Sequence, residues 1–339
     1  MAQGNNKQIT LISYPQGEPV PANFAAAESA IPAPGAGQIL LRNKYLSLDP
    51  YMRGRMSTAR SYAKGFEIGQ ALGGGTISEV VTSNNPNFAP GDLVLAAGGW
   101  QDYALSSGEG LTRIDPGLAP VTTALGVLGM PGMTAYIGLL NIGDPKPGET
   151  VVVAAAAGPV GATVGQIAKL KGCRTVGIAA GNKLDYLTAE LGFDAALDRR
   201  SADLRDELRE ACPLGIDVYF ENVGGAVWDA VAQQLNDFAR IPVCGLIAHY
   251  NDTQLPAGPD RMPTLMRLIL TRRLRIQGFI VSDFASQRGD FLRDVGSWFR
   301  EGKIKYREHI VDGLERAPEA FIKLLRGDNF GKMIVKIAD

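Results

Sequence analysis

The chain has 339 residues, and its 34 lysines and arginines against 35 aspartates and glutamates give a net charge of −1. This balance, with no run of like charges and no basic stripe, argues against nucleic acid as a partner. The length is enough for two domains, each with its own core. Cys173, Cys212 and Cys244 are in no paired spacing, and only two histidines are present. Neither a disulfide framework nor a four-thiolate zinc site can be assembled, and the two histidines provide few ligands for a catalytic zinc site.

The opening residues, MAQGNNKQ, lack the charged-then-apolar pattern of a secretory signal, which predicts a cytoplasmic protein. Residues 121–140 carry no charge and are about as long as a membrane span. Pro131, together with several glycines and threonines in this stretch, favours buried core helices over a helix that faces lipid. We therefore expect no membrane association.

Residues 7–117 show short apolar runs broken by proline and glycine, a pattern that predicts a β-rich domain. Residues 38–43 alternate as a half-buried strand, and residues 91–96 give a second strand after a Pro-Gly turn. Residues 46–56 between them are too mixed in polarity for a strand. We expect a loop there, which either lines a pocket or lies on the surface.

Residues 149–183 have the pattern of a strand, a tight glycine turn, a helix and a second strand at residues 175–179. Ala156, Gly158 and Gly161 occupy the three small-residue positions of a dinucleotide-binding turn, with Pro159 and Val160 between them. Proline is tolerated at the first helical turn, where its missing N–H has no intrahelical partner. The helix would direct its positive end at a pyrophosphate. The alternative is an ordinary tight turn between a strand and a helix.

The residues after the second strand indicate which dinucleotide is bound. An NAD site usually places an acidic residue about 20 positions beyond the glycines, but Lys183 stands there instead. Arg199 and Arg200 follow the next expected strand, residues 195–198, whose end lies at the same sheet edge. Two or three cations without a carboxylate favour a 2′-phosphate, and hence NADPH. The alternative is that these cations are solvated surface residues.

The pattern continues as alternating helices and strands. We expect a helix capped by Asn182 and ended by Gly192, and three further strands, at residues 216–220, 241–246 and 274–281. Leu265, Met266 and Ile269 have helical spacing within residues 262–270, which predicts a core face. Residues 221–225 and 247–251 follow two strands of an open parallel sheet, so both segments point toward a ligand site.

After about Gly302 the β-rich pattern returns, with strands at 306–311 and 332–337 around a helix at 318–325. The last strand is expected to pair with the first domain. The predicted fold class is α/β: residues 1–125 and 305–339 form a β-rich domain, and residues 126–304 form a Rossmann nucleotide-binding domain with a doubly wound parallel sheet. The cofactor is expected in the cleft between them.

With these residues in place, the chain resembles the medium-chain dehydrogenase/reductase superfamily, specifically its zinc-independent double-bond reductases: prostaglandin reductases, plant alkenal reductases and bacterial curcumin reductases. In these, a GroES-like catalytic domain accompanies the Rossmann domain. The resemblance runs from end to end. The motifs that carry it are LSLDPYMRGRM (46–56), PGMTAY (131–136), AAAGPVGATVGQIAKLKGC (155–173), ENVGG (221–225), CGLIAHYN (244–251), RIQGFIVSDF (275–284), EGKIKYRE (301–308) and NFGKMIVK (329–336).

The resemblance implies hydride transfer from NADPH to the β-carbon of an α,β-unsaturated aldehyde or ketone. It implies that Tyr250 donates the proton and that Tyr51 and Phe279 face the substrate. The residues that it assigns to the cofactor are the turn Ala156, Gly158, Pro159, Val160 and Gly161, with Thr134, Lys183, Asn222, Gly245, Tyr250, Phe279, Val281 and Asn329.

Two positions depart from relatives. A tyrosine common beside the 2′-phosphate corresponds to Arg199, which suits an anion, and His249 is interpreted as a passive neighbour of Tyr250. In zinc alcohol dehydrogenases, the loop that matches residues 47–49 supplies a cysteine ligand, which is missing here. We therefore expect no metal.

Other interpretations stay open. Tyr250 is alternatively a tyrosine at a domain junction whose hydroxyl is satisfied by backbone. The protein is alternatively an NADPH:quinone reductase, since quinones are also conjugated carbonyls, or a non-catalytic NADPH-binding protein. By family analogy the resemblance also implies a homodimer in which the late strand near residues 276–281 extends the sheet across the two-fold axis.

Overall fold

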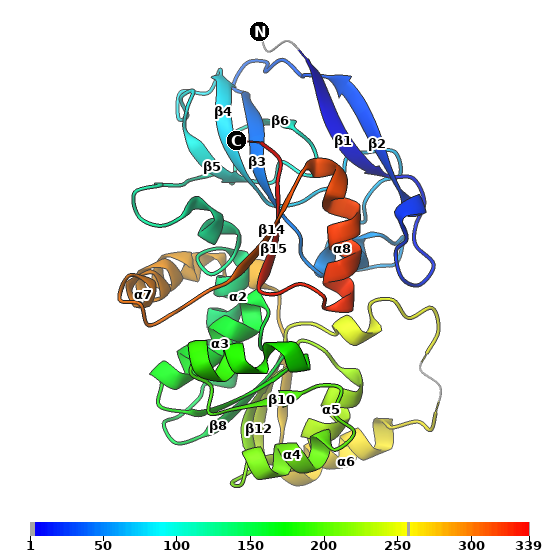
Figure 1. Ribbon diagram of the computed structural model, residues 1–339, viewed down its shortest axis with the longest axis vertical. Coiled ribbons are helices and arrows are strands. Elements are labelled where there is room, and N and C mark those ends of the chain that lie inside the picture. Colours follow the sequence, from blue (N-terminus) through cyan, green and yellow to red (C-terminus); the bar gives the residue numbers. More distant parts are fainter. Residues whose placement is uncertain (1–3, 256–257, 339) are drawn as a thin grey trace. The chain divides into compact units, whose positions relative to one another are not determined.

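The computed structural model describes residues 4–255 and 258–338. The chain divides into two compact units. Unit 1 consists of the residues up to Gly126 together with those from Glu308 onward, and unit 2 runs from Val127 to Arg307. Figure 1 shows this return of the chain by colour, with the red C-terminal strand beside the blue strand β3.

Unit 1 is β-rich, as predicted. Among the described residues, one sheet has the order β14-β15-β3-β4-β5-β7, with β6 also paired to β3, and β1 and β2 form a separate antiparallel pair. The elements of this unit are β1 (Asn5–Leu11), β2 (Phe24–Ala30), β3 (Ile39–Ser47), α1 (Tyr51–Arg55), β4 (Thr76–Ser83), β5 (Leu93–Ala96), β6 (Tyr103–Ser106), β7 (Thr112–Arg113), β14 (Glu308–Asp312), α8 (Ala317–Arg326) and β15 (Lys332–Lys336).

The C-terminal strand completes unit 1. β15 pairs with β3 in antiparallel register, with Ile334 opposite Ser47, which confirms the predicted return of the last strand. The core beneath is centred on Trp100, which stacks on Phe24 at 6.1 Å between ring centroids and meets the edge of Phe321 of α8 at 5.9 Å. Large apolar rings from distant segments therefore hold the C-terminal helix in this unit.

Unit 2 is a parallel α/β sheet, as predicted. Its order within the described residues is β10-β9-β8-β11-β12-β13, and every pairing is parallel. The elements are α2 (Met130–Ile137), β8 (Thr150–Ala154), α3 (Pro159–Leu170), β9 (Arg174–Ala179), β10 (Ala195–Asp198), α4 (Leu204–Ala211), β11 (Ile216–Phe220), α5 (Gly225–Val231), β12 (Leu235–Val243), α6 (Met262–Arg272), β13 (Arg275–Gly278) and α7 (Arg288–Arg300).

The central strand β8 is covered on both faces, which explains its apolar run. Val151, Val152 and Val153 are all fully buried. Val152 belongs to a cluster with residues of α4 and α5, while α3 contacts β8 and β9 and packs against α2. A strand buried on both faces needs β-branched apolar residues at successive positions, and this chain supplies them.

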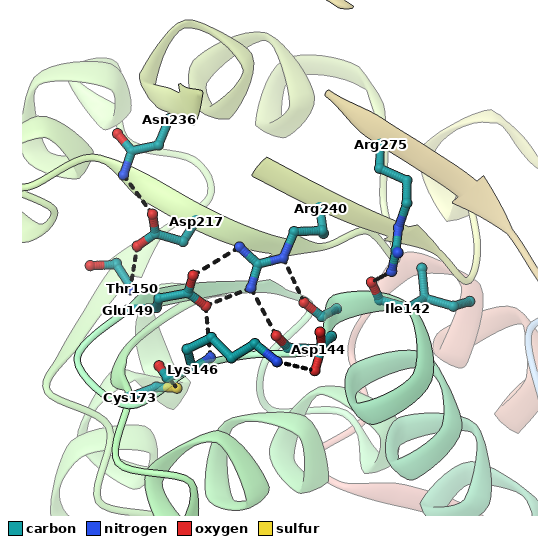
Figure 2. Close-up of polar contacts among 11 residues, drawn as sticks. Ile142, Asp144, Lys146, Glu149, Thr150, Cys173, Asp217, Asn236, Arg240 and Arg275 are labelled. Atoms are coloured by element: carbon teal, nitrogen blue, oxygen red, sulfur yellow. Dashed lines mark hydrogen bonds and ion pairs between the residues drawn. The ribbon is translucent and has the colours of Figure 1, made fainter. Parts of the chain in front are cut away.

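A polar network near the amino ends of the strands holds the edge of the sheet opposite to the predicted ligand edge (Figure 2). Arg240 of β12 makes two ion-pair contacts with Glu149, at 2.5 and 2.9 Å, and donates to the carbonyl of Gly143 at 2.8 Å. Asp217 of β11 accepts the amide of Thr150 at 2.8 Å. The Asp217 contact joins the neighbouring strands β8 and β11, and the Arg240 pair links β12 to the residue before β8 across β11. Bidentate arginine pairs of this kind fix geometry as well as charge.

Four local predictions were wrong. Residues 46–56 are not a loop, because β3 continues to Ser47 and α1 follows. Asn182 caps no regular helix, since a 3₁₀ turn at Gly181–Lys183 and a π-helix at Tyr186–Glu190 occupy that segment, although Gly192 does have a positive φ of 75°. Two strands were misplaced by several residues: β12 begins at Leu235 and ends at Val243, and β13 is confined to Arg275–Gly278.

The core prediction for α6 holds for part of the helix only. Leu265 and Ile269 are half-buried, but Met266 is 56% exposed. Met266 lies in an exposed apolar stripe with Met262, 57% exposed, and Leu270, 76% exposed. Within the described residues, no helix combines the length and the apolar character needed to cross a membrane.

Candidate active site

The turn from β8 into α3 has the geometry of a dinucleotide-binding turn. Ala155 adopts a left-handed φ of 52°, which is uncommon for alanine and is typical of functional turns. Gly158 is the N-cap residue and Pro159 the first residue of α3. A Cβ on Gly161 would lie 2.5 Å from the carbonyl oxygen of Ala155, so only glycine allows this close packing of helix and turn. The predicted strand, turn, helix and second strand are all confirmed.

The interior of this turn is small and buried. Ala156 is fully buried, and its amide donates to the carbonyl of Ile178 in β9 at 3.1 Å, which ties the turn to the next strand. Val160 follows Pro159 in the first turn of α3 and is partly exposed. A pyrophosphate at this helix end would meet backbone amides and the positive end of the helix dipole. The residues present therefore fit the phosphates of a dinucleotide.

The ends of β9 and β10 carry the expected cations. Lys183 lies in the 3₁₀ turn after β9 and is only 9% exposed, which does not fit a solvated surface lysine. Arg199 is exposed, and its amide donates to the carbonyl of Ala179 at 2.8 Å, which places its backbone beside the end of β9. The expected absence of a carboxylate was wrong, because Asp198 points at Gly181, with its Oδ2 2.5 Å from where a Cβ would be. Asp198 also accepts the amide of Arg200 at 3.0 Å.

Asn222 bridges the carboxyl ends of two strands. It follows β11, and its side-chain Nδ2 donates to the carbonyl of Ala154, the last residue of β8, at 2.8 Å. Its predecessor Glu221 is 2% exposed, and one carboxylate oxygen accepts the amides of Val223 at 2.6 Å and Gly224 at 2.8 Å. Burial raises the pKa of Glu221 despite these bonds. Sequence reasoning did not single out Glu221, although an acid between an apolar strand and a glycine turn is a usable signal.

Tyr250 and Gly245 lie together. Tyr250 lies in the segment after β12, as expected, and directly follows a 3₁₀ helix, Ile247–His249. Its hydroxyl oxygen is 3.0 Å from the position that a Cβ on Gly245 would occupy. The neighbouring His249 is exposed, and its Nδ1 lies 2.8 Å from Oδ2 of Asp252. The absence of a side chain at Gly245 therefore leaves room for the phenol of Tyr250.

Phe279, Val281 and Thr134 come from separate elements of unit 2. Phe279 follows β13, and its ring meets Phe220 of β11 edge to face, with centroids 6.3 Å apart. Its ring also approaches Gly138, directly after α2. Val281 is half-buried and begins a 3₁₀ helix, Val281–Gln287. Thr134 of α2 is 8% exposed, and its hydroxyl donates to the carbonyl of Met130 at 2.8 Å.

Two assigned residues belong to unit 1. Tyr51 is half-buried as the first residue of α1, and burial, followed by the negative charge of Asp49, raises its pKa. The phenol is therefore protonated at neutral pH and able to donate a hydrogen bond. Asn329 is 8% exposed, and its Nδ2 donates to the carbonyl of Gly331 at 2.7 Å. This bond fixes the orientation of the Asn329 side-chain amide.

A metal centre is not formed by the part of the chain that the structure describes, because no three His, Cys, Asp or Glu side chains are grouped as ligands. Cys173 and Cys212 are buried free thiols whose pKa values are raised by burial, to about 11 and about 12. Such thiols are neutral at physiological pH, whereas zinc binds the thiolate.

The fold and these residues define a class of protein, a two-unit oxidoreductase with a Rossmann nucleotide sheet. Family models agree: residues 7–114 match "N-terminal domain of oxidoreductase", and residues 159–295 match "Zinc-binding dehydrogenase". The chain belongs to the medium-chain dehydrogenase/reductase superfamily, in its zinc-independent group of enone and alkenal reductases.

Individual relatives match over nearly the whole chain. The NADPH-dependent curcumin reductase of Escherichia coli is 56% identical over 98% of this chain and 97% of its own length. Prostaglandin reductase 1 of Rattus norvegicus is 42% identical over 97% of this chain and 98% of its own. The crystal structure of CurA from Vibrio vulnificus in complex with NADPH is 54% identical, covers 98% of this chain and 99% of that one, and has a TM-score of 0.95.

Proposed function

We propose that this protein reduces the carbon–carbon double bond of α,β-unsaturated aldehydes and ketones with NADPH. The observation that carries the proposal is the end-to-end similarity to the NADPH-dependent curcumin reductase of Escherichia coli, at 56% identity. The buried Lys183, beside a turn that fits a dinucleotide, supports the phosphorylated cofactor. Bound NADPH supplies a hydride to the β-carbon of the substrate.

The chain's own residues are proposed to stabilise the negative charge that hydride transfer creates on the substrate. The substrate's carbonyl oxygen becomes negative as the β-carbon is reduced, and a donor aimed at that oxygen in a water-poor site stabilises it. Tyr250 is our choice for the proton donor, because its phenol lies against Gly245, where little else fills the space. Tyr51 and Phe279 are proposed to contact the substrate, and Asn222, Thr134, Val281 and Asn329 the cofactor.

A panel of substrates tests the proposal. Enals, enones, quinones and alcohols are each incubated with the protein and NADPH, cofactor oxidation is followed by absorbance, and the products are identified. We expect saturated aldehydes and ketones. Hydroquinone as the sole product would identify a quinone reductase, and cofactor binding without any turnover would identify a non-catalytic NADPH-binding protein.

Replacing Gly245 with alanine is expected to lower turnover several-fold. The added Cβ would meet the Tyr250 hydroxyl at 3.0 Å, closer than most such contacts, so the phenol must move. Gly245 is not in the left-handed region, so the alanine backbone itself is unstrained. The measurement is steady-state reduction of an enone in wild-type and Tyr250→Phe backgrounds. An equal loss in both backgrounds would show that the alanine does not act through the hydroxyl.

Turnover is expected to survive prolonged dialysis against a chelator. Catalytic zinc takes three protein ligands, and the described residues supply no such group. Activity is measured before and after dialysis, and metal content is measured in parallel. A loss of activity that added zinc restores would contradict this expectation.

The protein is proposed to be a homodimer that works in the cytoplasm. β13 is an edge strand of the unit 2 sheet in the described residues, with β12 on one side. An edge strand is a ready site for pairing with a second copy. The exposed stripe of Met262, Met266 and Leu270 on α6 adds apolar surface that a partner would cover. The free thiols suit a reducing compartment.

Light scattering after size exclusion is expected to give twice the chain mass of 36.1 kDa. The matched variant Met266→Lys places a charge on the stripe and is expected to raise the dimer dissociation constant. A wild-type mass of a single chain at micromolar concentration would contradict the dimer.

A further inference from the structure

Unit 1 contains a buried ion pair to which the roles above assign nothing. Lys332, the first residue of β15, is 2% exposed, and Asp49 is 5% exposed. The Lys332 ammonium lies 2.7 Å from Oδ1 of Asp49 and donates to the backbone carbonyl of Leu48, also at 2.7 Å. One side chain therefore holds two successive residues of the segment that leads into α1.

Two further groups complete this cluster. The Ser47 hydroxyl donates to the other carboxylate oxygen of Asp49. Glu308 of β14 is the strand partner of Lys332, and the negative charge of its carboxylate also favours the charged ammonium. The Thr122 side chain makes a hydrogen bond with Glu308. Asp49 thus has both oxygens engaged, and Lys332 is bonded to the Asp49 carboxylate and the Leu48 carbonyl of the segment before α1, with the Glu308 carboxylate of β14 as a further negative charge.

A buried pair of this kind is a costly way to stabilise a fold. The desolvation of both ions offsets much of their attraction, and well-packed apolar residues often do as well. What the pair provides beyond an apolar contact is direction, because short charge-assisted bonds fix both the position and the rotation of their partners. Here the partners are Leu48 and Asp49, which lie three and two residues before Tyr51, the first residue of α1.

The ion pair with Lys332 also compensates the negative charge of Asp49 near Tyr51. The Asp49 carboxylate lies two residues before Tyr51, and its negative charge, after burial, raises the pKa of the Tyr51 phenol. Without Lys332, that carboxylate would stand uncompensated near a phenol that is proposed to face a substrate gaining negative charge. Like charges repel strongly in a low-dielectric setting. Lys332 therefore bears on both the position of Tyr51 and the local electrostatic potential.

We propose that Lys332 is a positioning residue for the reduction of the enone: it holds Leu48 and Asp49 so that Tyr51 is correctly oriented toward the substrate, and it neutralises Asp49. This rests on the proposed function, because the role of Tyr51 comes from it. Lys332 itself does not touch the substrate.

The first test is a double-mutant cycle of Lys332→Met with Tyr51→Phe. Methionine keeps the length and the apolar stem but removes the charge. A misplacement of about 1 Å can cost roughly a hundredfold in reactivity. Because the misplaced group here is proposed to contact the bound substrate, we expect the KM for a simple enone to rise roughly ten- to a hundredfold, with a smaller change in kcat. In the Tyr51→Phe background the additional effect should be much smaller, because contacts that act through one residue are not additive.

A matched control separates positioning from stability. Val94→Ala removes buried volume in the same unit, but from a different core cluster that contains Ile39 and Val80. Its melting temperature is expected to fall while the KM stays at the wild-type value. If Lys332→Met raises the KM no more than Val94→Ala does, or if its effect and that of Tyr51→Phe simply multiply, the proposal is overturned.

A second variant covers the case in which Lys332→Met does not fold. Asp49→Asn keeps the shape and leaves the bond from Lys332 to the Leu48 carbonyl, so a several-fold rise in KM that disappears in the Tyr51→Phe background is expected. A KM for Asp49→Asn equal to wild type would overturn the proposal in that case.

Hydrogen exchange gives a readout that does not depend on activity. The Met52 amide donates to the Asp49 carbonyl and the Arg53 amide to the Pro50 carbonyl, both at 3.1 Å, so these two amides report on the segment directly. Faster exchange of both in the Lys332 or Asp49 variant, but not in Val94→Ala, is expected. Unchanged exchange would overturn the positioning role. A wild type that reduces no enone would instead contradict the proposed function, and the exchange result would still be informative about Lys332.

Discussion

Replacing Lys183 with alanine is expected to lower the affinity for NADPH roughly ten- to a hundredfold, while the affinity for NADH changes little. A hydrogen bond to a charged group contributes ~1.5–3 kcal/mol, which is about one to two decades in the dissociation constant. Lys183 is buried after the end of β9, so solvent screens its ammonium poorly. We therefore expect a loss of binding free energy in the upper part of this range. The measurement is fluorescence titration of both cofactors.

Two variants accompany this test. Lys169→Ala removes a lysine of the same unit that pairs with Asp194 at the far end of α3, and it should leave both affinities unchanged. Arg199→Ala tests whether the exposed arginine after β10 also contributes to binding of the 2′-phosphate. Equal wild-type affinity for NADH and NADPH would remove Lys183 from the 2′-phosphate site.

Replacing Tyr250 with phenylalanine is expected to lower turnover roughly ten- to a hundredfold, near the lower bound for general acid catalysis. The phenylalanine keeps the ring and its packing, so the change isolates the hydroxyl. The loss is not larger, because an enolate once formed can also take its proton from water. Steady-state reduction of a simple enone measures turnover, and titration checks that NADPH still binds.

The control for Tyr250 is Tyr103→Phe on β6, a half-buried tyrosine of unit 1 outside the assigned site, which should keep wild-type turnover. Unchanged turnover of Tyr250→Phe, in a wild type whose rate is limited by hydride transfer, would exclude the phenol as proton donor. A backbone amide or the cofactor's ribose hydroxyl would then take that role.

The nucleotide turn was predictable because its signals are local. Three valines, a run of small residues and a proline at the first helical position each constrain a few neighbouring residues, and β8, α3 and β9 follow with nearly the predicted bounds. α1 was missed because its mixed polarity was interpreted as a loop. Pro50, whose fixed φ suits a helix start, was the signal available.

Long-range burial could not be derived from the sequence pattern. The spacing of Leu265, Met266 and Ile269 predicts a helix, but which stripe of that helix is covered depends on where neighbouring strands lie. The burial of Lys332 with Asp49 is a stronger example, because these residues are distant in the sequence and a charged residue is exposed by default. Only the pairing of β15 with β3 brings them together.

The central claim, hydride transfer to the β-carbon of a conjugated carbonyl, is tested most directly by isotope labelling. A simple enone is reduced with NADPH that carries deuterium at the nicotinamide carbon that donates the hydride, and the product is analysed by NMR and mass spectrometry. We expect a saturated ketone with deuterium on the β-carbon and a solvent proton on the α-carbon. Deuterium on the carbonyl carbon, in an allylic alcohol, would contradict the proposed function.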